Sequence, residues 1–77
     1  MDRQATILNL IREVSKKDIT PAADDSLFES GLLDSFALPD LVSALEKEFH
    51  LSIPDSDLRP RKFDSITLIE SYLDSRN

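Results

Sequence analysis

Apolar residues recur at helical spacing in three stretches of the chain. Side chains at positions i, i+3, i+4 and i+7 lie on one face of a helix. The first stretch predicts a helix over about residues 3–15, with an apolar stripe of Ile7, Leu10, Ile11 and Val14. The second predicts a helix over about residues 36–49, with Leu38, Leu41, Val42, Leu45 and Phe49. The third follows Asp64 or Ser65, either of which can cap it, and turns Ile66, Ile69, Tyr72 and Leu73 inward.

The segments between these helices differ in character. Residues 16–34 form a long first loop that begins before Pro21, and loops of more than about 12–15 residues usually have a function. We expect its apolar residues to pin it to the core, with one helical turn near residues 25–30: Leu27, Phe28, Leu32 and Leu33. Gly31, the one glycine of the chain, indicates a backbone angle that other residues resist. Pro54 can start a short helix, and Pro60 interrupts the chain again.

No alternation typical of strands and no internal repeat is present in the sequence. We therefore expect an all-α fold, a small bundle of three main helices plus one short helix, with a long first loop. The chain has 77 residues, which predicts a single domain over residues 1–77. All the apolar stripes must then share one core.

Composition excludes several classes of protein. The chain has no cysteine, so disulfides, thiolate metal sites and cysteine nucleophiles are absent. No apolar run approaches the ~20 residues that a membrane helix needs, and the acidic, amphipathic N-terminus does not fit a secretory signal. A net charge of −6 should repel nucleic acid and anionic membranes and attract basic protein surfaces. The same acidity also serves solubility alone. We expect a monomer.

Ser35 stands where the second helix should begin. It can be a helix cap, a nucleophile or an attachment point. A nucleophilic serine needs a nearby base, but the one histidine, His50, lies fifteen residues further on, or about 22 Å along a helix. There is no Gly-x-Ser-x-Gly elbow, glycine-rich loop or His/Cys metal set. A phosphate ester at this position would meet the positive end of the helix dipole, so a hydroxyl modified by another protein fits better.

Three runs of residues carry a family resemblance. Residues 31–35 read Gly-Leu-Leu-Asp-Ser, residues 45–49 read Leu-Glu-Lys-Glu-Phe, and Ile-Pro follows at 53–54. Together they resemble acyl carrier proteins over nearly the whole chain. The resemblance implies a non-catalytic, cytoplasmic carrier in the fold of that family. Ser35 would receive 4′-phosphopantetheine from coenzyme A through a phosphopantetheinyl transferase, with Asp34 as its motif neighbour.

The same resemblance implies that partner enzymes read the second helix. Loading and acyl-transferring enzymes with basic docking patches would contact its surface at Phe36, Pro39, Asp40, Ser43, Glu46 and Lys47. Pro39, Ser43 and Lys47 depart from the usual family pattern and suggest a specialised carrier. Because proline is tolerated only in the first helical turn, we expect the regular helix to start near Leu38, or its first turn to be distorted.

The sequence leaves the cargo open. An acyl group of a fatty-acid, polyketide or other specialised pathway is the first expectation, held as a thioester on the arm. An aminoacyl or peptidyl group, D-alanyl included, is the alternative. A non-carrier acidic helical adaptor, with Ser35 only a cap, is the third. Residues that could line an acyl cleft serve equally as ordinary core, and we expect core: Val42, Leu45, Ile53, Leu58, Phe63, Ile66, Ile69 and Tyr72. Arg59, Arg61 and Lys62 form a small basic patch that we expect to be solvated.

Overall fold

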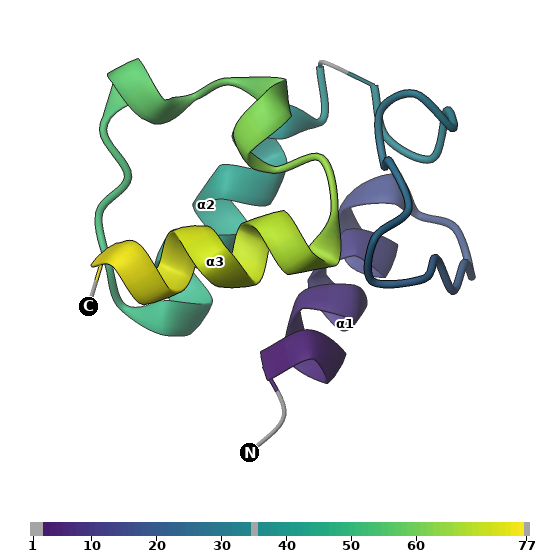
Figure 1. Cartoon of the computed structure of the whole chain (residues 1–77), viewed down its shortest axis with the longest axis horizontal. Helices are drawn as coiled ribbons and strands as arrows, with labels where there is room; N and C mark the ends of the chain where they lie inside the picture. The colour runs from purple at the N-terminus through teal and green to yellow at the C-terminus, as the bar shows by residue number, and fades with distance from the viewer. Residues whose placement is uncertain (1–2, 35, 77) are drawn as a thin grey trace.

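The computed structural model describes residues 3–34 and 36–76. Its elements follow the order α1 (Arg3–Ser15), α2 (Leu38–Phe49), η1 (Asp55–Asp57), η2 (Pro60–Lys62) and α3 (Ile66–Arg76), where η marks a 3₁₀ turn (Figure 1). No strand occurs in this part of the chain. The all-α prediction and its three main helices are confirmed. The prediction of one short helix was incomplete, because a second 3₁₀ turn starts at Pro60, which the sequence suggested only as an interruption.

The three helices share one core. Helix α1 packs against both α2 and α3, and Figure 1 shows the long first loop to one side of them. The apolar stripes predicted from the spacing face inward, together with apolar residues of the loops. The buried set is Ile7, Leu10, Ile11, Leu27, Leu33, Leu38, Leu41, Val42, Leu45, Ile53, Phe63, Ile66, Ile69 and Leu73. Val14, Phe49 and Tyr72 pack at its edge and are only partly buried.

Local rules explain where the helices start and end. Helix α2 begins at Leu38 with Pro39 in its first turn, as predicted, because an N–H is not needed there. It ends where His50 takes a left-handed conformation with φ 55° and donates its N–H to the carbonyl of Glu46. Helix α3 is capped by Ser65, whose Oγ accepts the N–H of Leu68 at 3.1 Å.

The long first loop is held against the core. Leu27 and Leu33 are buried, while Phe28 and Leu32 are half-buried. The expected helical turn appears as a single hydrogen-bonded turn, in which the N–H of Ser30 reaches the carbonyl of Ser26 at 3.3 Å. Gly31 has φ 82°, the left-handed conformation for which a glycine was expected. Among the described residues, no helix is both long enough and apolar enough to cross a membrane.

Candidate functional site

A tight turn precedes helix α2. The N–H of Ala37 is shared between the carbonyl of Asp34 and its carboxylate Oδ1, each at 3.0 Å. Ala37 has helical dihedral angles, and its carbonyl accepts the N–H of Leu41 at 2.9 Å. Asp34 therefore closes the turn onto the first turn of the helix with its side chain. Ser35 itself lies outside the described residues.

Both chain neighbours of Ser35 are on the surface. Asp34 is exposed, and the ring of Phe36 is 87% exposed, the largest exposure of any large apolar side chain described. A cavity of about 160 Å³ lies beside Asp34 and Ala37, between the end of α1 and the long loop, and Lys17 is among its lining residues. The residues on both sides of Ser35 are therefore open to contact by a second protein.

The residues predicted to face partners lie along one side of α2. Pro39, Asp40, Ser43 and Lys47 are all exposed, and their spacing of three and four residues continues from Phe36. Glu46 differs from them. It is half-buried, and its Oε2 accepts the N–H of Ile53 at 2.8 Å, which ties the chain after α2 back onto the helix. The carboxylate of Glu46 thus has a structural role beside any partner contact.

The residues proposed for an acyl cleft are packed as core. Six of the eight are at most 6% exposed, and they belong to the one buried cluster: Val42, Leu45, Ile53, Phe63, Ile66 and Ile69. Leu58 and Tyr72 are half-buried at its edge. Within the described ranges, no group of three or more His, Cys, Asp or Glu side chains is placed to hold a metal ion.

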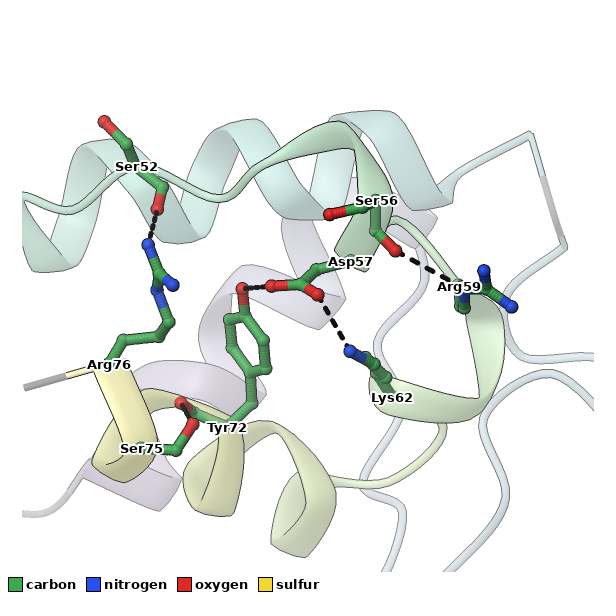
Figure 2. Close-up of polar contacts among 8 residues, drawn as sticks. All are labelled: Ser52, Ser56, Asp57, Arg59, Lys62, Tyr72, Ser75 and Arg76. Carbon is green, nitrogen blue, oxygen red and sulfur yellow. Dashed lines mark hydrogen bonds and ion pairs between the residues drawn. The ribbon is translucent and has the colours of Figure 1, made fainter.

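A polar network that the sequence did not predict ties η1, η2 and α3 together (Figure 2). The hydroxyl of Tyr72 donates to Asp57 Oδ2 at 2.7 Å, and Lys62 Nζ donates to Asp57 Oδ1 at 2.8 Å. Arg76 reaches the carbonyl of Ser52 at 3.0 Å. These bonds border an open groove of about 540 Å³ that also contacts Arg61. No local pattern could have indicated the network, because its members lie on different elements.

Two pKa values are shifted in this network. The hydrogen bonds from Lys62 and Tyr72 hold the pKa of Asp57 below its ordinary value of 3.8. Burial, and then the hydrogen bond to Asp57, raise the pKa of Tyr72 from 10.0 to about 12. Both shifts favour an ionised carboxylate on Asp57 and a neutral phenol on Tyr72 at neutral pH. The network stabilises the connection before α3 and has no nucleophile or base arranged for catalysis.

The sequence is similar to a known protein family and to several known proteins. A family model described as "Phosphopantetheine attachment site" matches residues 5–68. A D-alanyl carrier protein of Streptococcus suis is 39% identical over 57 residues, which cover 74% of this chain and 72% of that protein. The D-alanyl carrier protein of Streptococcus mutans is 30% identical over 78 residues, covering 100% and 99% of the two chains. One from Lactobacillus acidophilus is 24% identical over 75 residues, covering 97% and 95%.

Proposed function

Because this chain belongs to the acyl carrier protein family and has its phosphopantetheine attachment domain, we propose that Ser35 carries the 4′-phosphopantetheine and that the cargo is a D-alanyl group. The family is non-catalytic, and its prosthetic group is 4′-phosphopantetheine. The match over residues 5–68 supports the proposal because it includes residues 31–35, Gly-Leu-Leu-Asp-Ser, which come shortly before α2.

The residues around this position suit an attached phosphodiester. Asp34 and Phe36 are exposed, so a transferase can approach the turn from solvent. The carboxylate of Asp34 accepts the N–H of Ala37, and this hydrogen bond partly offsets its negative charge. Lys17 lines the adjacent cavity and adds a positive charge on that side. When bound, the arm supplies a thiol that holds the cargo as a thioester.

Ser35 has one chemical role in this proposal. Its Oγ forms a bond to phosphorus as the pyrophosphate bond of coenzyme A breaks, the hydroxyl proton is lost, and adenosine 3′,5′-bisphosphate leaves. The transferase provides the catalysis. Asp34 shapes the turn, and the exposed side of α2, from Phe36 to Lys47, is the surface that we propose partner enzymes with basic patches contact. Carboxylates such as Asp40 would mainly raise the rate of encounter.

Two observations support D-alanyl cargo over a long acyl chain. The similar proteins named above are D-alanyl carrier proteins. In addition, the side chains that would line an acyl cleft are packed against one another, with Leu45, Phe63 and Ile69 all 0% exposed. A small polar aminoacyl group needs no apolar cleft, because its charged amine is best left in water. A role in fatty-acid or polyketide synthesis has no comparable support. A single domain, a monomeric state and a cytoplasmic location stay predictions.

The attachment site is tested by intact mass. The chain is incubated with coenzyme A and a broad-specificity phosphopantetheinyl transferase, beside Ser35→Ala. We expect one added phosphopantetheine on the wild type and none on the variant, because no other hydroxyl occupies the motif. Ser56→Ala is the control, because Ser56 is exposed and also follows an aspartate but lies in η1, outside the proposed partner surface, and this variant should be modified normally. Addition to Ser35→Ala would contradict the assignment. No addition to the wild type, where a known carrier is modified, would favour the adaptor function.

The cargo is tested on the modified chain. It is offered to an ATP-dependent enzyme that charges a streptococcal D-alanyl carrier protein, with D-alanine or L-alanine, and separately to an enzyme that charges acyl carriers with fatty acids. We expect the mass to increase by one alanyl residue with D-alanine only. The streptococcal carrier is the positive control. Charging with a fatty acid and not with D-alanine would overturn the cargo assignment and leave the carrier function intact.

A further inference from the structure

Most of the hydrogen bonds between the loop that leads to Ser35 and the start of α3 are made by one residue, Asp64. We propose that Asp64 is a positioning residue for the modification site: it holds residues 26–34 in the arrangement that the transferase binds. Its Oδ1 accepts the hydroxyl of Ser26 at 2.8 Å and the N–H of Phe28 at 3.1 Å, and Oδ2 lies 2.9 Å from the same hydroxyl. This inference rests on the proposed role of Ser35.

The bonds continue through the backbone toward Ser35. The carbonyl of Asp64 accepts the N–H of Leu27, and the carbonyl of Leu27 accepts the N–H of Leu33 at 2.9 Å. Leu33 stands two residues before Ser35 in the sequence. The side chains of Leu27 and Leu33 are 0% and 2% exposed, so both are anchored in the core. The position of the segment before Ser35 is therefore coupled to residue 64.

Asp64 is available for this contact because its neighbour caps the helix. Either Asp64 or Ser65 was predicted to cap α3, and Ser65 does so with its Oγ. The carboxylate of Asp64 turns to the loop instead. A second bond between the same two segments, from the N–H of Thr67 to the carbonyl of Ala23 at 3.0 Å, fixes the earlier part of the loop. Residues 23–28 are thus held against the start of α3 by several hydrogen bonds.

Loss of the carboxylate would loosen this loop without removing the core. The N–H of Phe28 and the hydroxyl of Ser26 would lose their acceptor, and a group left unsatisfied costs free energy. The loop would then spend part of its time undocked. A ligand that binds only the docked form sees its apparent dissociation constant rise by the inverse of the docked fraction. A positioning role therefore predicts a higher KM for the transferase, with kcat nearly unchanged.

The test uses Asp64→Ala, with Asp64→Asn as the conservative variant that keeps one acceptor oxygen. Amide hydrogen exchange on the unmodified chain should speed up at Phe28, Leu27 and Leu33 in Asp64→Ala. The KM for phosphopantetheine transfer should rise about five-fold if the docked fraction falls to about a fifth. Asp64→Asn should keep most of the wild-type protection from exchange and a KM close to that of the wild type. If Asp64→Ala does not fold, Ser26→Ala removes the side-chain part of the contact from the loop side and should show the same, smaller changes.

Asp57→Ala is the matched control. It removes another carboxylate that accepts two side-chain hydrogen bonds. These come from Lys62 and Tyr72 rather than from the long first loop. It should lower stability and leave the KM unchanged. Equal KM values for wild type and Asp64→Ala, or an equal rise in Asp57→Ala, would overturn the positioning role while modification of the wild type still upheld the proposed function. A wild type that is never modified would overturn both, and the wild-type sample alone reveals it.

Discussion

At the scale of single residues, the contacts of Tyr72 show how one side chain serves both core and surface. Its ring lies 5.1 Å from that of Phe63, centre to centre, with the planes tilted by 58°. Its hydroxyl reaches Asp57, which also binds Lys62. An aromatic residue with a polar end suits the edge of a core in this way, because the ring is buried while the hydroxyl still finds a partner.

This arrangement predicts a loss of stability at alkaline pH. The pKa of Tyr72 is raised from 10.0 to about 12, so the folded chain holds the phenolic proton more tightly than the unfolded chain does. The stabilisation is complete below pH 10 and is lost as pH rises from 10 to about 12. We expect Tyr72→Phe to be less stable than the wild type at pH 8 and to show a shallower decline between pH 10 and 12.

Urea unfolding at several pH values measures this difference. The ring contact with Phe63 is kept in Tyr72→Phe, so the comparison isolates the hydroxyl. The other ionisable groups are present in both proteins, so their contributions cancel in the difference. Parallel curves for the two proteins across this range would show that the proton of Tyr72 is not held by the fold.

At the scale of elements, the long first loop depends on one backbone conformation. Gly31 has φ 82°, and it follows the turn that Ser26 and Phe28 form on Asp64. Its N–H reaches the carbonyl of Phe28 at 3.2 Å and closes that turn. The chain then reverses so that Leu33 can enter the core. The conformation of residues 26–31 thus depends on the hydrogen bonds to Asp64 at one end and on Gly31 at the other.

Gly31→Ala should therefore destabilise the chain by about 1–2 kcal/mol, the cost of placing an L-residue with a side chain in the left-handed region. A Cβ at this position would meet no other atom within 4 Å, so the backbone angle and not a clash causes the loss. Gly31→Asn should cost less, since asparagine tolerates this region. Urea denaturation measures all three proteins. Equal stability of Gly31→Ala and the wild type would mean that the loop can turn in another way.

Helix α2 shows how element boundaries affect the site. Pro39 was expected to delay the regular helix, and the helix does begin at Leu38. Ala37, the residue before it, is thereby left to the turn that Asp34 closes. The exposed ring of Phe36 projects from the same turn. Because the spacing of apolar residues predicts a helix but not the form of its first turn, this geometry follows from proline chemistry and from the bond between Asp34 and Ala37 together.

At the scale of the whole molecule, stability depends on one small core. A folded domain is stable by about 0.05–0.15 kcal/mol per residue, or about 4–12 kcal/mol for a chain of this length. The core draws on all three helices, on the long loop through Leu27 and on the second connection through Ile53 and Phe63. Because the fold has one buried cluster, a loss of contacts in it should lower the stability of the whole fold.

Leu45→Ala should destabilise the chain by about 2–5 kcal/mol, because a large buried side chain is replaced by a cavity. Leu45 is 0% exposed, in the middle of α2. This loss is a large part of the total, so we expect a lower urea midpoint and weaker modification of Ser35 at 37 °C. Leu68→Ala is the control: that leucine is 43% exposed on α3, and its loss should cost less than about 1 kcal/mol. Equal midpoints for the two variants would contradict this view of the core.

The sequence by itself determined the three main helices, the start of α2 and the position of the Asp-Ser motif that we propose is modified. Helical periodicity, proline and glycine act within a few residues of themselves, so their effects can be read locally: the stripe of α1, the start of α2 at Leu38 and the turn at Gly31 are examples. The run from Gly31 to Ser35 was likewise contiguous and could be recognised without a fold.

Only the tertiary structure decided which polar side chains meet. Asp64 was predicted as a possible cap, yet it binds Ser26 and Phe28, which lie 38 and 36 positions earlier in the chain. Glu46 was predicted to face partners, yet it also holds the N–H of Ile53. Such pairs form only after helix packing brings distant segments together, and many acidic residues of this chain could have filled the same roles. The packing of the core thus decides which polar side chains form hydrogen bonds with one another. Through Asp64 it also sets the position of the loop that leads to Ser35.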